Sequence, residues 1–217
     1  MLVRACLQGG DHAWEFARRR RRPYLCNATV RLQEMLRTDL GDGVGLRPMS
    51  VDDADELHAV IVRNRDHLRP WMPWADQDLE RTRQYLRDAT LDPRDIQAAV
   101  TMDGRIVGAI GLVHPAGFAM VGYWLAAEAQ GRGIMTRAVL AFVDHALDDL
   151  GYDRVELRAA VNNARSRAVA ERAGFVLMRT IPDAAVINGR SVDHVVYERR
   201  RSSLSGGPGA PSRAAGR

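Results

Sequence analysis

The 217-residue sequence predicts an α/β domain with a mixed, mostly antiparallel and twisted sheet of about seven strands, flanked by about four helices. Three observations indicate this class. The dipeptide Asp103-Gly104 separates two apolar runs, which is typical of a β-hairpin. Residues 132–150 place apolar side chains at helical spacing. Strand-like and helix-like segments also follow one another along most of the chain, which favours a sheet covered by helices.

The start of the first helix and the loop after it have clear local signals. Ser50 followed by Asp53 resembles a capping box, which marks a helix N-terminus. Two prolines in 69–75 predict a loop or tight turn. The expected elements are, in order, a strand over 44–50, helices over 52–68 and 78–91, strands over 96–102, 105–114 and 118–126, a helix over 132–150, a strand over 153–161, a helix over 164–173, a strand over 175–181 and a last hairpin around Asn188-Gly189.

The helix over 132–150 carries the clearest pattern in the chain. Its apolar positions fall on one face, and Gly151 follows them as a glycine does at a helix C-terminus. That face should pack on the sheet. Its members are Met135, Val139, Phe142, Val143, Ala146, Leu147 and Leu150.

Composition excludes several classes of protein. No apolar run approaches the roughly 18 residues needed to cross a bilayer, so we expect no membrane association. The N-terminus lacks the order of charged, apolar and small residues of a signal peptide, so we expect a cytoplasmic protein. The six histidines show no metal-binding spacing, and no metal is expected.

Arginine is concentrated at the two ends, and the chain contains no lysine. Residues 1–34 hold 7 arginines against 3 acidic residues. The run Arg18 to Arg22 raises the question of nucleic-acid binding, but no aromatic residues are interleaved with it, so a solvated tail is favoured. We therefore expect a poorly ordered basic extension over 1–42, a domain over 43–200 and a disordered tail over 201–217.

The stretch QGRGIMTRAV places glycines where a helix begins. Gly131 and Gly133 would let the backbone approach a ligand closely, and the first helical turn offers unpaired N–H groups to an anion. Arg132 adds a cation suited to phosphate. A Walker loop is excluded because it needs a lysine, and a dinucleotide fingerprint would need a glycine at Thr136. A plain glycine-rich turn is the alternative.

The same stretch carries a family resemblance. YWLAAEAQGRGIMTRAV resembles the acyl-CoA pyrophosphate motif Q/R-x-x-G-x-G/A of the GNAT superfamily of N-acyltransferases, although Met135 stands where Gly or Ala is usual. VNNARSRAVAERAGF, 161–175, is similar to a second segment of that family, as are the loop RPWMPWA and the terminal NGR hairpin. Together they resemble the RimJ/RimL type, which acetylates the N-terminal amine of ribosomal proteins, over about residues 44–198.

The resemblance implies a GNAT fold and acetyl-CoA as the acyl donor. It implies that strand 118–126 splays from strand 153–161, that pantetheine pairs with the exposed edge, and that a backbone amide near 124–126 polarises the thioester. Arg132 and Arg137 would stand beside the pyrophosphate, and Asn163 would bind the cofactor arm. The implied cofactor residues are Trp124, Leu125, Ala126, Gln130, Gly131, Arg132, Gly133, Ile134, Met135, Thr136, Asn163 and Ser166.

The resemblance also implies catalytic and acceptor residues. Ser166 would protonate the leaving thiolate, or else be an ordinary polar residue in a helix's first turn. Trp71, Trp74 and Tyr123 would bind the acceptor, although core packing explains the tryptophans equally well. Where relatives often have a glutamate as general base, this chain has Ala185, so Asp183 or Glu128 would have to replace it.

A missing strong base favours an acceptor that is partly neutral by itself. An α-amine has a pKa of about 7.7–8.0, so roughly one in ten is neutral at pH 7, whereas a lysine amine at about 10.4 is neutral roughly once in two thousand. We therefore expect a protein N-terminus as acceptor. Two alternative functions remain: acetylation of a small amine such as an aminoglycoside or polyamine, and a non-catalytic acyl-CoA sensor. The protein could also form a homodimer. An acidic rim would favour the small amine, and a blocked sulfur end would favour the sensor.

Overall fold

The computed structural model describes residues 36–91, 95–113 and 118–201, so most of the expected N-terminal extension and C-terminal tail lies outside the described residues. The strands in this part of the chain are β1 (Thr38–Gly41), β2 (Val44–Pro48), β3 (Asp95–Met102), β4 (Arg105–Val113), β5 (Ala119–Leu125), β6 (Arg154–Ala160), β7 (Val176–Ile187) and β8 (Arg190–Arg200). The α-helices are α2 (Ala54–Arg63), α3 (Arg65–Leu68), α4 (Leu79–Leu91), α5 (Ile134–Asp148) and α6 (Ala164–Arg172), with 3-10 turns over Val51–Asp53 and Ala127–Ala129.

All eight strands form one sheet in the order β1-β2-β3-β4-β5-β6-β8-β7. Every neighbouring pair is antiparallel except β5 and β6, which are parallel. The expected mixed, mostly antiparallel α/β fold is confirmed. The sheet has one strand more than expected because β1 lies inside 1–42, where a strand of four residues is too short to produce a visible period.

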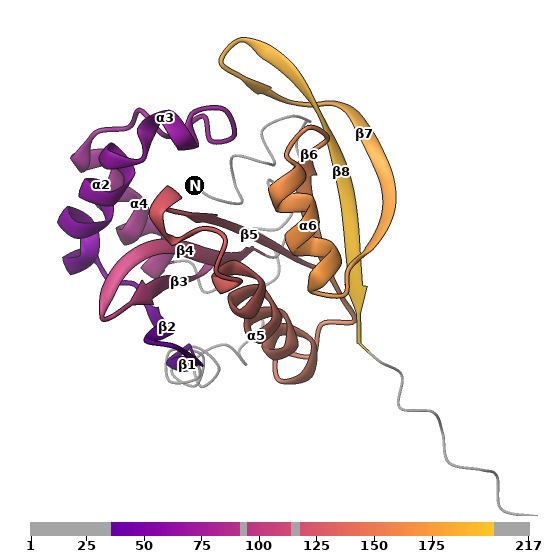
Figure 1. The fold of residues 1–217 in the computed structure, drawn as a ribbon, viewed down its shortest axis with the longest axis horizontal. Helices are drawn as coiled ribbons and strands as arrows, with labels where there is room; N and C mark the ends of the chain where they lie inside the picture. The colour runs from indigo at the N-terminus through magenta and orange to yellow at the C-terminus, as the bar shows by residue number, and fades with distance from the viewer. Residues whose placement is uncertain (1–35, 92–94, 114–117, 202–217) are drawn as a thin grey trace, which may run out of the picture.

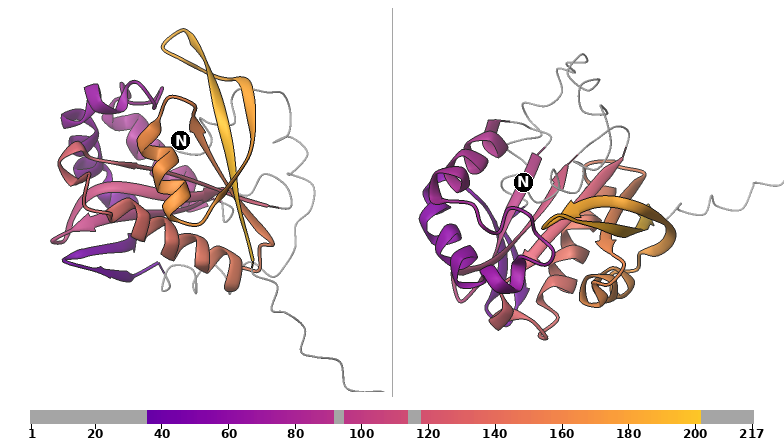
Figure 2. Two further views of the ribbon diagram at one scale, coloured as in Figure 1. Left: turned by 45° about the vertical axis from the view of Figure 1, so that its right-hand side comes forward. Right: turned by 90° about the horizontal axis from the view of Figure 1, so that it is seen from above.

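Helices cover the sheet on both faces. In Figure 1 and in the right-hand view of Figure 2, α2, α3 and α4 lie on one side of the sheet, with α5 and α6 on the other. One apolar cluster joins α2 to residues such as Met120 and Trp124, whose side chains leave β5 on that face. A second and larger cluster joins α5 to Val121 and Leu125, on the opposite face.

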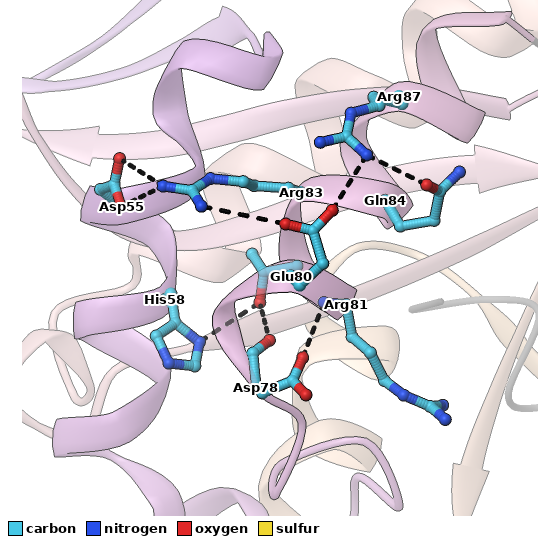
Figure 3. Close-up of polar contacts among 9 residues, drawn as sticks. Asp55, His58, Asp78, Glu80, Arg81, Arg83, Gln84 and Arg87 are labelled. Atoms are coloured by element: carbon cyan, nitrogen blue, oxygen red, sulfur yellow. Dashed lines mark hydrogen bonds and ion pairs between the residues drawn. The ribbon is translucent and has the colours of Figure 1, made fainter.

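Local signals set the helix boundaries. The capping box is present as expected: the Ser50 hydroxyl accepts from a backbone amide, and the Asp53 carboxylate accepts from the Ser50 amide at 2.8 Å. Asp78 accepts from the Arg81 amide at 2.8 Å and so caps α4. Figure 3 shows the polar contacts that join α4 to α2, including Arg83 to Asp55 at 3.0 Å.

Helix α5 packs through the face that the sequence predicts. All the expected members of that face are buried except Leu150, which is partly buried. Gly151 ends the helix with φ of 76°. The two hairpin turns are also confirmed, because Asp103-Gly104 and Asn188-Gly189 all have positive φ, as a type I′ turn requires.

The sheet opens between its two central strands. β5 and β6 pair only through Ala119–Val121 and Val155–Leu157. Beyond these residues β5 stays paired with β4 as far as Leu125, and β6 stays paired with β8 as far as Ala160. The second half of each strand therefore borders a gap within the sheet, and this opening positions the candidate site.

Candidate active site

A cavity of about 1110 Å³ occupies the gap and continues to the N-terminus of α5. It contains most of the expected cofactor residues, together with residues from α3, the loop after it and α6. Its lining residues are His67, Leu68, Trp71, Met72, Tyr123, Trp124, Leu125, Ala127, Ala129, Gln130, Gly131, Gly133, Ile134, Met135, Thr136, Asn162, Asn163, Ala164, Arg165, Ser166, Ala168, Val169 and Arg172.

The N-terminus of α5 faces this cavity without a side-chain cap. Gly131 and Gly133 adopt φ of 78° and 69°, and a Cβ at either position would meet no atom within 4 Å. Within the protein itself, glycine is therefore needed for the backbone conformation and not to avoid neighbouring atoms. No side chain caps the helix, and its first turn carries no acidic residue. The first N–H groups of α5 are thus available to an anion.

Two arginines of α6 provide positive charge in the cavity wall. Arg165 and Arg172 both line the cavity, seven residues apart and hence on one face of the helix. Arg172 Nε donates to Thr136 Oγ1 at 3.3 Å, next to the start of α5. Sequence reasoning assigned neither residue, although their spacing beside the expected cofactor residue Asn163 was a usable signal.

The side chains of Arg132 and Arg137, which were expected beside the pyrophosphate, make contacts with other residues in the structure. Arg132 is exposed and does not line the cavity, and its Nη1 lies 3.4 Å from Met102 Sδ. Arg137 is paired with Asp42 at 2.8 Å and donates to the Leu40 carbonyl at 3.0 Å. In the structure, the guanidinium groups that line the cavity therefore come from α6.

Gln130 links both sides of the cavity. Its Oε1 accepts from Arg165 Nη1 at 2.6 Å, and its Nε2 lies 2.7 Å from His67 Nε2. Nε2 also lies 3.5 Å from the Leu125 carbonyl oxygen. Because the amide oxygen faces a guanidinium, the amide nitrogen faces His67, which makes His67 Nε2 the acceptor. His67 is a further cavity residue that sequence reasoning did not assign.

The free edge of β5 offers backbone groups to a ligand. The Ala126 amide is not available, because it donates to the Val107 carbonyl of β4 at 2.8 Å. Hydrogen-bonding directions alternate along a strand, so the N–H of Leu125 points away from β4 and into the gap. Ala126 also does not line the cavity, whereas Leu125 does. Of the expected amides at 124–126, Leu125 is therefore the one that can act as an oxyanion donor.

Tyr123 and Ser166 place two hydroxyl groups together in the cavity. Tyr123 OH lies 3.0 Å from Ser166 Oγ and 3.2 Å from the Ser166 carbonyl oxygen. Asn163 fixes Ser166 by capping α6, since its Oδ1 accepts from the Ser166 amide at 3.1 Å. Burial raises the pKa of Tyr123 far above its usual value despite the opposing hydrogen bond to Ser166. Both hydroxyls are therefore protonated at neutral pH and can donate.

Comparison with known proteins identifies this arrangement. The sequence profile of the family described as Acetyltransferase (GNAT) domain matches residues 44–176. The chain belongs to this family of acetyltransferases. The resemblance found in the sequence is therefore confirmed, and the chain is an acetyltransferase.

Three relatives illustrate the similarity. YdaF of Bacillus subtilis (strain 168), which carries the provisional name of a ribosomal N-acetyltransferase, is 30% identical over 181 residues, 79% of this chain and 99% of YdaF. The ribosomal-protein-serine acetyltransferase of Escherichia coli (strain K12) is 25% identical over 168 residues, 74% of this chain and 94% of the relative. The crystal structure of the microcin C7 self-immunity acetyltransferase MccE, in complex with acetyl-CoA and AMP, has a TM-score of 0.70 at 25% identity, covering 76% of this chain and 96% of that one.

The two tryptophans of the loop in this acetyltransferase have different surroundings. Trp71 lines the cavity beside Met72. Trp74 is only 8% exposed and packs edge-on against Trp124, with 6.0 Å between ring centroids. The expected place of Trp74 in the acceptor groove is corrected, because its ring fills the core under α2 and does not line the main cavity.

The acetyltransferase does not bring the expected carboxylates to the cavity. Asp183 is exposed in a bulge of β7 with φ of 51°, and its carboxylate accepts from the Ser191 hydroxyl. Glu128 is exposed in the 3-10 turn after β5. Ala185, at the position of the missing glutamate, is buried opposite Val192. Neither Asp183 nor Glu128 lines the cavity, so neither is placed to accept a proton there.

The described residues of the acetyltransferase were also compared with the requirements of a metal site and of a membrane span. In residues 36–91, 95–113 and 118–201, no three His, Cys, Asp or Glu residues are grouped so that they could hold a metal ion. None of the helices in the same residues combines the length and the apolar character needed to span a membrane.

Proposed function

We propose that this acetyltransferase transfers the acetyl group of acetyl-CoA directly to the N-terminal α-amine of a protein, in a complex that holds donor and acceptor together. The main support for acetyl-CoA binding is the uncapped N-terminus of α5, which faces a cavity lined by Arg165 and Arg172. Helix N–H groups and guanidinium groups are the ordinary partners of a pyrophosphate. MccE, a relative of the same fold, binds acetyl-CoA.

The residues of the gap supply the remaining functions. The free edge of β5 would pair with the pantetheine arm, and the Leu125 amide would stabilise the oxyanion that forms at the thioester carbonyl. Asn163 has its Oδ1 occupied by capping α6, so its Nδ2 is the atom left for the arm. The departing sulfur would receive a proton from Ser166, which Tyr123 supports from 3.0 Å.

The charge of the cavity favours a protein N-terminus over a polycation. Among the residues of the described chain that line it, two are arginine and none is a carboxylate. Aminoglycosides and polyamines carry several ammonium groups and need acidic partners, so they are poorly matched. Two relatives with sequence similarity over most of this chain are named as ribosomal acetyltransferases, which supports the same acceptor.

The cavity also argues against a non-catalytic sensor. It runs from the glycine-rich start of α5 to Tyr123, Ser166 and Trp71 without interruption. A protein that only senses acyl-CoA would need no open space beyond the thioester sulfur of the bound acyl-CoA. The continuous space leaves room for an acceptor at the thioester.

A pair of peptides tests the acceptor. Peptide one has a free N-terminus and no lysine, and peptide two has a blocked N-terminus and one lysine. With acetyl-CoA at pH 7 and free-thiol detection, we expect turnover of the first and almost none of the second, since so few lysine amines are neutral. Equal turnover of both peptides would refute an α-amine acceptor, and turnover of spermidine alone would favour the small-amine alternative.

A further inference from the structure

Gln130 joins parts of the protein that are far apart in the sequence. It follows the 3-10 turn after β5, and its side-chain amide contacts His67 of α3 on one side and Arg165 of α6 on the other. All three residues line the cavity. Gln130 and His67 are half-buried, whereas Arg165 is exposed. The cavity wall therefore contains a continuous chain of hydrogen bonds from α3 to α6.

The guanidinium of Arg165 fixes the polarity of this chain. A guanidinium can only donate, so the atom of Gln130 that lies 2.6 Å from Arg165 Nη1 is the amide oxygen. The amide nitrogen then faces His67 Nε2, 2.7 Å away, and needs an acceptor there. A neutral imidazole with its proton on Nδ1 supplies that acceptor. His67 therefore selects the orientation of the Gln130 amide that suits Arg165.

A second contact, three residues earlier in both segments, keeps His67 opposite Gln130. The Asn64 side chain accepts from the Ala127 amide at 2.8 Å through Oδ1 and donates to the Val60 carbonyl at 3.1 Å through Nδ2. Asn64 is only 4% exposed, and both polar atoms of its side chain are hydrogen-bonded within the protein. Asn64 therefore holds the junction of α2 and α3 against the turn before Gln130, and His67 makes the corresponding contact in the cavity wall.

Arg165 needs support because its side chain is long and exposed. An arginine without a partner samples many rotamers, and ordering them on a ligand costs free energy. The bond to Gln130 orders the guanidinium in advance and leaves it further N–H groups for a phosphate. Arg172, the other arginine of the cavity wall, is held differently, since its Nε donates to Thr136 Oγ1 at 3.3 Å. The two guanidinium groups are therefore positioned by separate contacts.

We infer that His67 is a positioning residue for the acyl donor: through Gln130 it holds the guanidinium of Arg165 in place for the pyrophosphate of acetyl-CoA. This inference rests on the proposed function, in which Arg165 contacts that pyrophosphate. The end of α3 also continues directly into the loop that contains Trp71, because the Leu68 carbonyl accepts from the Trp71 amide at 2.9 Å. The donor phosphate site is thus connected to this loop through His67.

The affinity for acetyl-CoA, measured by calorimetry, tests the chain. His67→Leu removes the acceptor and should raise the Kd about fivefold, the usual effect of losing one neutral hydrogen bond. His67→Gln places an amide oxygen near the position of Nε2 and should bring the Kd back to within about twofold of wild type. His58 of α2 is also half-buried, contacts Thr82 at 3.3 Å and does not line the cavity, so His58→Leu and His58→Gln are matched controls that should bind normally.

Double-mutant cycles identify the arginine through which His67 acts. In an Arg165→Ala background, His67→Leu should change the Kd by less than about twofold, because the end of the chain is already missing. In an Arg172→Ala background, the effect of about fivefold should persist. Equal effects of His67→Leu in the two backgrounds would overturn the inference, and so would a His67→Gln variant that binds as weakly as His67→Leu.

These measurements separate the inference from the proposed function. If Arg165→Ala binds acetyl-CoA like wild type, the phosphate contact of Arg165 and the inference both fall. If Arg165→Ala binds weakly and His67→Leu binds normally, the inference alone is overturned. Should His67→Leu not fold, Gln130→Met interrupts the chain at its centre: a weaker affinity that depends on the presence of Arg165 supports the inference, and wild-type affinity overturns it.

Discussion

Asn188, at the tip of the β7–β8 hairpin, donates from Nδ2 to the backbone carbonyl oxygen of Arg69, 3.0 Å away and 119 residues earlier in the chain. Arg69 in turn is paired with Asp76 at 2.7 Å. The hairpin tip, which extends beyond the sheet in Figure 1, is thus joined to the loop that carries Trp71. The loop whose Trp71 was expected to bind the acceptor is therefore connected to the last hairpin.

Substitution of the two tryptophans of this loop should separate binding from stability. Trp71→Ala should raise the KM for the peptide more than the KM for acetyl-CoA, because Trp71 lines the cavity. Trp74→Ala should instead lower the free energy of unfolding by about 3–5 kcal/mol, as for other buried aromatic residues. Steady-state kinetics and denaturant unfolding measure the two effects. Equal peptide KM values for Trp71→Ala and wild type would remove Trp71 from the acceptor site.

Substitution by valine of the glycines near the two ends of α5 should separate loss of stability through backbone strain from loss of acetyl-CoA binding. Gly133 and Gly151 both have positive φ, which a β-branched residue rarely adopts, so both variants should lose stability. Only Gly133→Val should abolish acetyl-CoA binding in calorimetry, because Gly151 lies at the far end of the helix. Intact binding in folded Gly133→Val would revive the alternative of a plain glycine-rich turn.

The arginines of α6 whose side chains line the cavity should contribute to the affinity for acetyl-CoA, and the others should not. Arg165→Ala and Arg172→Ala should each weaken acetyl-CoA binding by about 1.5–3 kcal/mol, the range for hydrogen bonds to charged groups. Arg167, on another face of α6, lies 3.3 Å from Tyr197 OH, so Arg167→Ala is the control and should bind normally. Arg132→Ala should also bind nearly normally if its side chain stays beside Met102. A larger loss for Arg132→Ala than for Arg165→Ala would restore the role first expected for Arg132.

The capping box should contribute to acid sensitivity. Burial opposes ionisation of Asp53, but hydrogen bonds from Arg47 and the Ser50 amide outweigh it, and its pKa is lowered. Its stabilisation is therefore complete above the unfolded pKa, about 3.9, and is lost as the pH falls through the folded pKa. Asp53→Asn should cost about 1–2 kcal/mol of unfolding free energy at pH 7 and progressively less below pH 4. The exposed Asp52→Asn is the control, and a constant Asp53→Asn difference down to pH 2 would contradict the assignment.

Truncation should locate the start of the domain. We propose that residues 1–34 and 202–217 are dispensable for folding and acetyl-CoA binding. A chain of residues 35–201 should keep the Tm of the full protein. A chain of 43–201 should melt lower, because it loses β1, the buried Leu36 and the ion pair of Asp42 with Arg137. Equal Tm values for the two shortened chains would return the boundary to residue 43.

Much of the fold could be predicted because its signals are local. The periodicity of α5, the capping box at Ser50 and the turn at Asp103-Gly104 each depend on residues close together in sequence. β1 could not be predicted, since its pairing with β2 depends on register and not on pattern.

The sequence predicted those parts of the site that depend on backbone conformation. It did not predict the parts where side chains from distant segments meet. Gly131 and Gly133 were found because a helix start with positive φ needs glycine. Whether Arg132 or Arg165 reaches the cavity depends on how α6 packs against α5. Trp71 and Trp74 are three residues apart in a loop without a period, so their different burial could not be read from spacing.

The short ladder between β5 and β6 also bears on how the protein avoids unwanted association. Unpaired strand edges readily recruit strands from other molecules. Here two such edges, at Gly122–Leu125 and Arg158–Ala160, face each other inside the sheet. Both edges lie inside one continuous sheet, whose outermost strands are β1 and β7. These two unpaired edges are therefore not at the outer boundary of the sheet, where edge-to-edge pairing with another molecule begins.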